Sequence, residues 1–458
     1  HLHAPSRERR LLRRAPWLVA LILALLTTTA RQWELLAGSL PRRTVRVRTP
    51  LALPADAAFD EFRAGSGGKA ASTTTAFTRL LRALSRDPQF GRRVVPIIPD
   101  EARTFGMDSL FKEFGIYAAQ GQKYEPVDHS LLLSYKESID GQLLEEGITE
   151  AGALSSWVAA SASYSVHGLP MLPLYIYYSI FGFQRVGDLI WAAADQRARG
   201  FLLGATAGRT TLSGEGLQHQ DGSSLLVAAT VPNCRAYDPA FAGELAVILD
   251  HGARQMLERG EDVFYYVTVM NENYAQPSLP EGAAEGVVRG LYRYARHGGA
   301  DAAPAVRLVG SGTILREVIA AAEMLSADWN QPCEVWSATS FSELARDARE
   351  AERWNRLHPS QAPRVSHLGH CLAGDTPVVA ATDYVAAWPQ LVAPYLDAPF
   401  TALGGRTFRR FSSDATTEYF WEEVARVTPR HLGAYSAIVS TAGDSVAAPS
   451  PRQPPQQQ

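Results

Sequence analysis

The chain has 458 residues, of which 46% are hydrophobic and 20% charged. These values are ordinary for a globular protein and suggest roughly two or three domains. The net charge of −3 gives no electrostatic case for a nucleic-acid partner. Three widely spaced cysteines, Cys234, Cys333 and Cys371, form neither a CxxC metal site nor an even disulfide set. They fit a reducing, cytoplasmic compartment.

The amino-terminal segment starts at His1 rather than Met, so we expect a fragment, a processed form or an incomplete gene product. Its apolar run, residues 17–26, resembles a signal-peptide core and is short against the roughly 20 residues of a membrane-spanning helix. We therefore expect no membrane anchor and treat residues 1–40 as a divergent segment. Residues 41–72 are rich in Pro, Gly, Ala and Arg, which predicts a linker.

The next elements alternate between strands and helices. Ser72 can cap a helix whose apolar side chains recur at helical spacing from Phe77 to Leu84. Further along the chain we expect a strand at 94–98, a helix at 147–165, a strand at 171–178, a helix at 183–198, and strands at 202–206, 225–231 and 263–270. This α/β alternation predicts a parallel sheet with helices on both faces, in a domain spanning residues 73–290.

A second α/β domain is expected over residues 291–445, after a helix and hinge at 282–303. Its strands are predicted at 306–310, 334–341 and 377–382, and the first of them leads through Gly310-Ser-Gly into a helix. That glycine pair is a weak nucleotide-binding signal, because a dinucleotide fingerprint needs a third glycine and a downstream acid. The Pro/Gln-rich residues 446–458 are expected to form a disordered tail.

Several polar and aromatic residues follow the predicted strands. Glu150 opens a helix, where an acid either does chemistry or complements the helix dipole. Tyr178 and Phe181 could offer a stacking face or simply pack in the core. His219 lies in a loop too polar for the core, between Glu215 and Asp221, which could orient it. A further acidic pair, Asp100 and Glu101, follows a strand and is by default solvated.

Four stretches together resemble one enzyme family: residues 94–107, 145–153, 173–185 and 214–222. They are similar to the decarboxylating first component of the pyruvate dehydrogenase complex, in its homodimeric bacterial type. The resemblance runs from about Leu40 to Leu403. It implies a thiamine-diphosphate-binding, transketolase-like pyrimidine domain with a parallel sheet, followed by a transketolase C-terminal-like α/β domain.

The resemblance also implies roles for individual residues. Glu150 would hydrogen-bond the aminopyrimidine of thiamine diphosphate, and Ile148 would be the apolar wedge that bends this cofactor. Phe181 would lie against the pyrimidine and Tyr178 near the substrate. His219 would line the substrate end, binding a carboxylate or moving a proton. The Asp100-Glu101 pair would lie beside the cofactor at a subunit boundary. Here Ser223 stands where the family usually has a second histidine, which puts neighbouring contacts in doubt.

The family's diphosphate-binding residues have no counterpart in this chain. Holding Mg²⁺ and a diphosphate requires a Gly-Asp-Gly motif with a downstream Asn, and the sequence contains no Gly-Asp-Gly. We therefore expect no metal site here: the Mg²⁺ ligands would belong to an absent amino-terminal domain. After Leu403 the chain also departs from the family pattern.

The function implied is oxidative decarboxylation of pyruvate with acetyl transfer to a lipoyl group. The implied partners are a second copy of the chain and the lipoyl transacetylase component. Two alternatives stay open: another thiamine-diphosphate enzyme of the transketolase type, and a non-catalytic truncated fragment that only dimerises or assembles.

Overall fold

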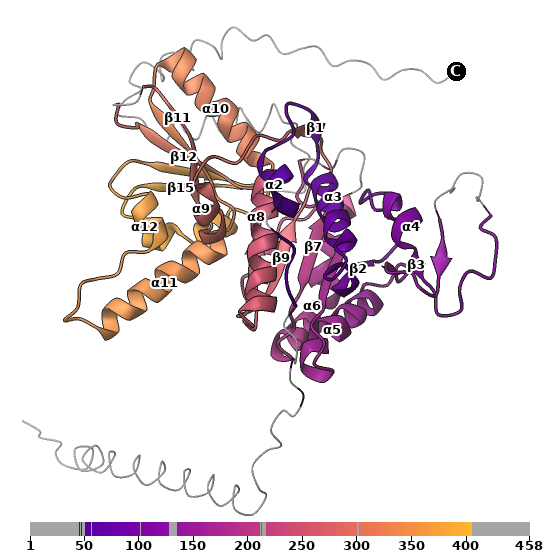
Figure 1. The fold of residues 1–458 in the computed structure, drawn as a ribbon. Helices are drawn as coiled ribbons and strands as arrows, with labels where there is room; N and C mark the ends of the chain where they lie inside the picture. Colours follow the sequence, from indigo (N-terminus) through magenta and orange to yellow (C-terminus); the bar gives the residue numbers. More distant parts are fainter. Residues whose placement is uncertain are drawn as a thin grey trace, which may run out of the picture.

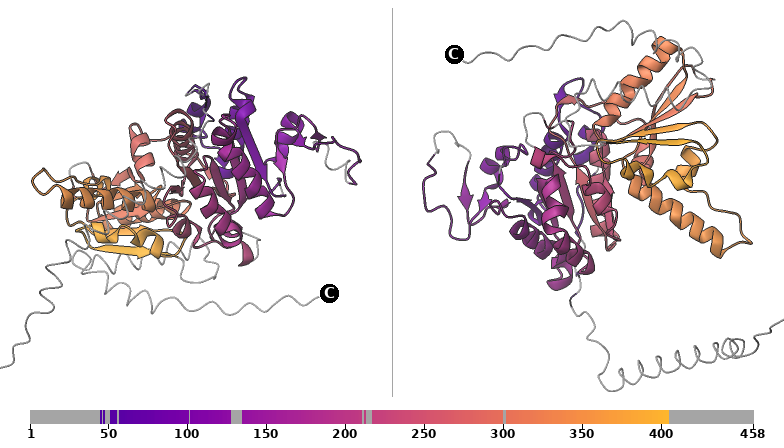
Figure 2. Two further views of the ribbon diagram at one scale, coloured as in Figure 1. Left: turned by 90° about the horizontal axis from the view of Figure 1, so that it is seen from below. Right: turned by 180° about the vertical axis from the view of Figure 1, so that it is seen from behind.

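The computed structural model describes residues 45, 47, 51–55, 57–100, 102–127, 135–210, 212, 217–299 and 302–404. The predicted amino-terminal segment and the disordered tail lie outside these residues. The described chain forms two α/β domains side by side, coloured indigo to pink and orange to yellow (Figures 1 and 2). The predicted fold class, a parallel-sheet domain followed by a second α/β domain, is confirmed.

The first domain is built on one six-stranded sheet in which every neighbouring pair of strands is parallel. Because parallel strands need crossover connections, this topology agrees with the α/β alternation in the sequence. In spatial order the strands are β5 (Leu144–Glu145), β2 (Val94–Ile98), β6 (Leu172–Tyr178), β7 (Phe201–Ala205), β9 (Phe264–Thr268) and β8 (Cys234–Tyr237).

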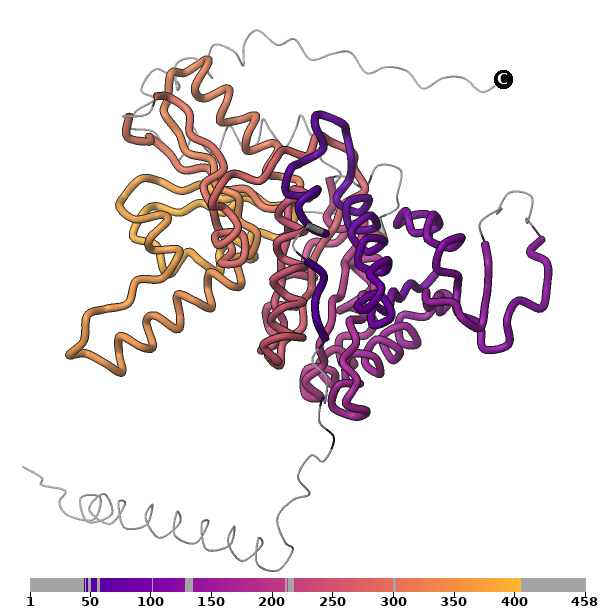
Figure 3. The backbone as a smooth tube through the Cα atoms, viewed as in Figure 1, coloured from indigo at the N-terminus to yellow at the C-terminus, as the bar shows by residue number. Residues whose placement is uncertain are grey.

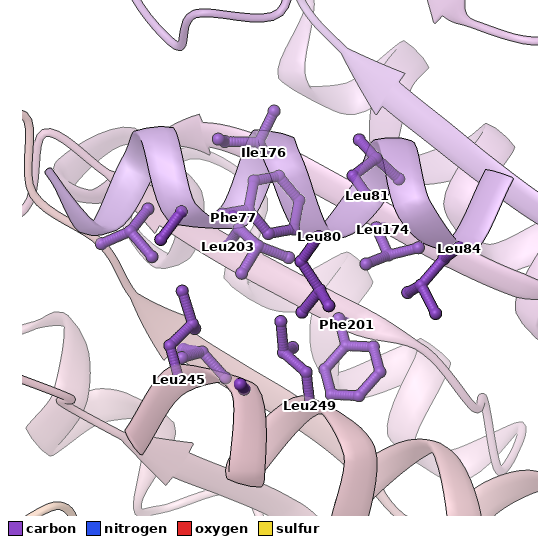
Figure 4. Packing of buried hydrophobic residues seen from close by; sticks show 14 of the residues in the cluster. Phe77, Leu80, Leu81, Leu84, Leu174, Ile176, Phe201, Leu203, Leu245 and Leu249 are labelled. Carbon is purple, nitrogen blue, oxygen red and sulfur yellow. The ribbon is translucent and has the colours of Figure 1, made fainter. Parts of the chain in front are cut away.

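Side chains of the central strands alternate between two buried faces. On β6, Leu174 and Ile176 join the core cluster that contains α3 (Thr73–Arg86) and α8 (Ala242–Ala253). Figure 4 shows α3 packing its apolar side over this face of the sheet. The intervening Tyr175 and Tyr177 join a second cluster, with α5 (Glu150–Val166) and α6 (Ser179–Asp195). The domain is thus a three-layer α/β/α structure.

The local signals for α3 and β2 predicted these elements well. Ser72 caps α3, its hydroxyl accepting the Thr75 N–H at 3.0 Å, and Phe77 is fully buried. The strand predicted at 94–98 is present with the same limits. Helix α6 begins at Ser179, four residues before the predicted start, because it follows β6 without a loop.

The strand predicted at 225–231 is wrong. This run forms the short helix α7 (Ser224–Ala228), and the strand of this region is β8, further along the chain. The Asp221 carboxylate accepts the N–H groups of Ser223 and Ser224, each at 3.0 Å, which starts a helical turn. A short apolar run does not distinguish a buried strand from a helix, and the Asp221 contacts favour the helix here.

Two predicted connections are more structured than expected. Within the predicted linker, α2 (Ala57–Arg63) buries Phe59 and Phe62 in the first core, and β1 (Ala70–Ala71) pairs with β10 (Tyr274–Ala275). The predicted helix and hinge at 282–303 contains the helix α9 (Ala283–Arg289) and then β11 (Tyr292–His297). Both segments carry apolar side chains that are stabilised by burial.

The segment between β2 and β5 has no counterpart among the predicted elements. It contains α4 (Asp108–Phe114), β3 (Ile116–Tyr117) and β4 (Glu137–Ser138). It projects from the side of the first domain that faces away from the second domain (Figures 1 and 3).

The second domain contains a mixed five-stranded sheet in which only β11 is antiparallel. The sheet is flanked by α10 (Ile314–Trp329) and α11 (Phe341–Leu357). Its strands, in spatial order, are β11, β13 (Cys333–Ser337), β12 (Val306–Gly310), β14 (Val378–Ala381) and β15 (Phe400–Leu403).

Short helical segments complete the described chain. They are η1 (Gly91–Arg93), η2 (Leu217–His219), η3 (Arg254–Glu258), α12 (His367–Cys371), α13 (Ala387–Gln390) and η4 (Ala393–Tyr395). Within the described residues, no helix combines the length and apolar character needed to cross a membrane. The apolar run at 17–26 lies outside them.

Candidate active site at the carboxyl ends of the first sheet

Glu150 is the first residue of α5, just beyond the carboxyl end of β5. The Thr149 hydroxyl caps this helix by accepting the Gly152 N–H at 3.2 Å. The Glu150 side chain is 13% exposed and forms an ion pair with Arg185, whose Nη1 lies 2.6 Å from Oε1. The Glu150 carboxylate therefore lies at the end of the sheet, paired with the positive charge of Arg185 on the neighbouring helix α6.

An aromatic cluster forms where β6 runs into α6. Tyr178 ends the strand, and Phe181 lies in the first turn of the helix, with ring centroids 5.9 Å apart. Phe105, from the loop after β2, packs on the other side of Tyr178 at 5.4 Å. The direct passage from strand to helix places these rings at the carboxyl end of the sheet, where ligands bind in open α/β folds.

Arg185 connects the aromatic cluster to Glu150. It lies one helical turn after Phe181, and its guanidinium carbon is 3.8 Å from the centre of that ring. The same guanidinium binds Glu150, so Arg185 makes a cation–π contact and an ion pair at once. The ion-pair partner of Arg185 is thus the candidate catalytic carboxylate itself.

His219 reaches the same aromatic cluster from the loop after β7. Its ring centroid lies 4.5 Å from that of Tyr178 and 5.5 Å from that of Phe181. Asp221, which was expected to help orient His219, uses both carboxylate oxygens to bind groups at the start of α7. Glu215 lies outside the described residues. The structure thus brings together Glu150, Tyr178, Phe181 and His219.

The acidic pair after β2 is described only in part. Asp100 is exposed, and Glu101 lies outside the described residues. Glu145 of β5 stands opposite Ile98, the last residue of β2. Burial, with the negative charges of Asp100 and Glu137, raises the pKa of Glu145 to about 7. The sequence did not single out Glu145, because it is the fold that buries this side chain and brings the charge of Asp100 near it.

Ile148 and Glu146, which both precede α5, differ in exposure and in their contacts. Ile148 is 76% exposed, so its apolar side chain is available to a ligand or another surface. Glu146 accepts a hydrogen bond from the Ser156 hydroxyl at 2.5 Å and belongs to the local structure of α5. Phe105 and the double contact of Arg185 were not predicted. The only signal for Phe105 was its place at the end of the Asp-Glu-Ala-Arg-Thr-Phe loop.

The arrangement can bind a flat, partly polar ring. It offers aromatic surface, a carboxylate able to accept an N–H, and an imidazole able to exchange a proton. Among the described residues, no group of three or more His, Cys, Asp or Glu side chains is placed to hold a metal ion.

Two family models match successive parts of the chain. The pyruvate dehydrogenase E1 component middle domain matches residues 52–277, and the transketolase-like C-terminal domain matches residues 290–434. The first match contains all the candidate site residues. The second starts two residues before β11.

Curated relatives named pyruvate dehydrogenase E1 component match most of this chain. The Pseudomonas aeruginosa protein is 54% identical over 360 residues, covering 78% of this chain and 41% of its own length. The Cupriavidus necator protein is 50% identical, covering 84% and 43%. The Escherichia coli K12 protein is 48% identical, covering 85% and 44%. The chain therefore spans less than half the length of these relatives.

Solved transketolase structures share the fold at much lower identity. The Leishmania mexicana enzyme matches with a TM-score of 0.58 at 16% identity, covering 82% of this chain and 50% of that one. The Campylobacter jejuni enzyme gives 0.54 at 16%, covering 79% and 46%. These likenesses concern the fold alone. The family-model matches and the relatives near 50% identity show that the chain belongs to the pyruvate dehydrogenase E1 family, of which it carries the middle and transketolase-like C-terminal domains.

Proposed function

We propose that this chain supplies the pyrimidine-binding half of an oxidoreductase that decarboxylates pyruvate with the help of thiamine diphosphate. The observation that carries the proposal is the convergence of Glu150, Phe181, Tyr178 and His219 at one end of the first sheet. Sequence identity near 50% to proteins named pyruvate dehydrogenase E1 component supports the same enzyme class. Transketolase likeness at 16% identity supports only the fold.

The residues present fit the aminopyrimidine part of the cofactor. An aromatic side chain, Phe181, can lie against its ring, and the nearby Glu150 carboxylate can hold a proton on a ring nitrogen. The exposed Ile148 provides apolar surface at the same helix start. When bound, thiamine diphosphate supplies an acidic thiazolium carbon that can serve as a nucleophile toward 2-oxo acids.

The substrate end of the site is assigned to His219 and Tyr178. An imidazole donates or accepts protons near neutral pH, and as a cation it attracts a carboxylate. His219 is therefore proposed to bind the pyruvate carboxylate or to move a proton during its loss. The Tyr178 ring contacts the His219 ring edge to face, with centroids 4.5 Å apart. Asp100 and Glu101 are proposed to join a polar network beside the cofactor.

The diphosphate part of the cofactor needs a metal-ligand set that the described part of the chain does not assemble. Mg²⁺ takes oxygen ligands from carboxylates and carbonyls, and no suitable acidic group is assembled among the described residues. The chain covers 41% of the P. aeruginosa relative. We infer that the Mg²⁺ ligands lie on a complementary amino-terminal domain, and that a second copy of the chain takes part in the complete site.

The remaining expectations extend this proposal. The acetyl group would pass to a lipoyl group on the transacetylase component of the same complex. The reaction would take place in the cytoplasm, in accord with the three free cysteines Cys234, Cys333 and Cys371. The competing function is that of a non-catalytic fragment that only dimerises or assembles.

One complementation experiment separates these two functions. The chain is joined in frame behind the amino-terminal part of the P. aeruginosa relative, and release of CO₂ from pyruvate is measured with thiamine diphosphate and Mg²⁺. The proposal expects turnover by the joined protein and none by the chain alone. A folded joined protein without turnover favours the assembly function, whereas turnover by the chain alone contradicts the assignment of the Mg²⁺ ligands to another domain.

A further inference from the structure

The second domain reaches into the loop that carries His219 through Asp383, the second residue after β14. The Asp383 Oδ2 atom accepts the backbone N–H of Arg209 at 2.6 Å, the N–H of Thr210 at 3.0 Å and the Thr210 hydroxyl at 3.1 Å. The Asp383 side chain is buried, 4% exposed. Three donors from the first domain therefore converge on one oxygen of the second domain.

The other end of the same loop is held by a neighbouring residue of the second domain. The Val385 N–H donates to the carbonyl of Gly222 at 2.9 Å, and the Asp221 N–H donates to the carbonyl of Gly208 at 3.1 Å. Asp221 is fully buried and Gln220 is 6% exposed, so the two residues that follow His219 are fixed. The base of the loop, residues 208–210 and 221–222, is thus clamped from residues 383–385.

Gly208 shows how close this contact is. Its φ is +82°, and a Cβ added there would lie 2.4 Å from Asp383 Oδ2. Such a distance is well inside van der Waals contact, and the backbone conformation favours glycine. The turn after β7 is therefore shaped to receive the carboxylate.

A reciprocal contact joins the domains without touching this loop. Asp238, which follows β8 of the first domain, accepts hydrogen bonds from the hydroxyls of Ser311 at 2.7 Å and Thr268 at 2.6 Å. The Gly312 N–H donates to the Asp238 carbonyl at 3.1 Å. Each domain thus inserts a buried aspartate into a glycine turn of the other, and Asp238 is a matched control for Asp383.

We propose that Asp383 is a positioning residue that sets the place of His219 from the second domain. Its three hydrogen bonds fix the start of the loop, and Val385 fixes the end one residue after Asp221. His219 is separated from the anchored Asp221 by a single residue, so its ring is held against Tyr178. The significance of this placement rests on the proposed function, in which His219 meets the substrate.

The test observes His219 directly, with no need for turnover. The full chain is labelled with ¹³C-histidine, and the His219 ring resonance is identified by its loss in His219→Gln. Because the Tyr178 ring lies 4.5 Å away, the native resonance should carry a ring-current displacement. Asp383→Ala should abolish this displacement, and Asp383→Asn, which keeps an accepting oxygen, should restore most of it.

The control and a milder variant keep the test decisive. Asp238→Ala loosens the same domain junction but should leave the His219 resonance in place. If Asp383→Ala does not fold, Thr210→Val removes one of the three donors and should move the resonance part of the way. The proposal is overturned if the His219 resonance stays in place in both Asp383→Ala and Thr210→Val. It is also overturned if Asp238→Ala moves this resonance as far as Asp383→Ala does. If the joined protein with Asp383 intact shows no pyruvate turnover, while Asp383→Ala still displaces the His219 resonance, the proposed function is refuted and the positioning role stands.

Discussion

Arg185 and Glu150 form an ion pair at 2.6 Å between α6 and α5, while the same guanidinium stacks on Phe181. The Arg185 side chain therefore contacts both the candidate catalytic carboxylate and the Phe181 ring. Both contacts use the charge, but stacking also uses the flat shape of the guanidinium, which lysine lacks. Arg185 is a positioning residue in this account.

Arg185→Ala in the joined protein should lower kcat/KM for pyruvate by about tenfold, equivalent to about 1.4 kcal/mol of transition-state stabilisation. Arg185→Lys should recover only part of the loss, because it keeps the charge without the planar stacking surface. Arg197 pairs with Asp262 at 3.3 Å outside the candidate site, and Arg197→Ala provides the control. Equal kinetics for the two alanine variants would remove Arg185 from the site.

A buried acid, Asp238, and a half-buried acid, Glu145, give a second prediction, for the free energy of unfolding of the chain. Burial raises the pKa of Asp238 from 3.8 to about 7, and that of Glu145 from 4.5 to about 7. Between about pH 4 and 7 the folded chain then keeps protons that the unfolded chain has released. Stability from these groups is therefore complete at low pH, falls as the pH rises through this window, and levels off above about 7.

Each raised acid contributes a slope of at most about 1.4 kcal/mol per pH unit. Asp238→Asn and Glu145→Gln should each flatten the decline between pH 5 and 7, because the amides stay neutral. Urea unfolding of the wild type and both variants across this range measures the difference. A variant whose profile runs parallel to the wild type would show that its acid does not have the raised pKa assigned here.

The packing of α3 on the first sheet predicts a large effect of one core truncation. Leu80 is 1% exposed and packs within the face shown in Figure 4. Leu80→Ala should lower the free energy of unfolding by about 2–5 kcal/mol, since a buried cavity is left behind. Leu357→Ala, at a side chain 63% exposed, should change it by less than about 0.5 kcal/mol. Similar denaturation midpoints for both variants would contradict the three-layer arrangement.

The sequence predicted those elements whose signals are local. The strand at 94–98 is a short apolar run closed by Pro99, and α3 has both a serine cap and a helical apolar pattern, so each could be placed. The run at 225–231 had no such distinguishing period, and Asp221, which was expected beside His219, accepts a backbone N–H at the start of α7. A side chain's partner is set by the folded loop and not by its distance along the chain.

The long-range parts of the site were beyond local patterns. The resemblance to family motifs singled out Glu150, Tyr178, Phe181 and His219. The fold places these four residues together. The weak Gly310-Ser-Gly signal has a structural explanation, because the Ser311 hydroxyl and the Gly312 N–H both donate hydrogen bonds to Asp238. Asp383 contacts residues more than 170 positions away, and nothing near it in the sequence indicates this.

A comparison of two neighbouring acids in the joined protein tests whether Glu150 acts on the cofactor. Glu150 faces the proposed aminopyrimidine site, whereas Glu146 binds Ser156 within the local structure of α5. Glu150→Gln should lower the rate of pyruvate decarboxylation by about 10²–10⁴-fold, since the carboxyl group can no longer share a proton with the cofactor ring. Glu146→Gln should leave the rate within a few fold of wild type. Equal, mild effects of the two substitutions would contradict the assignment of this site.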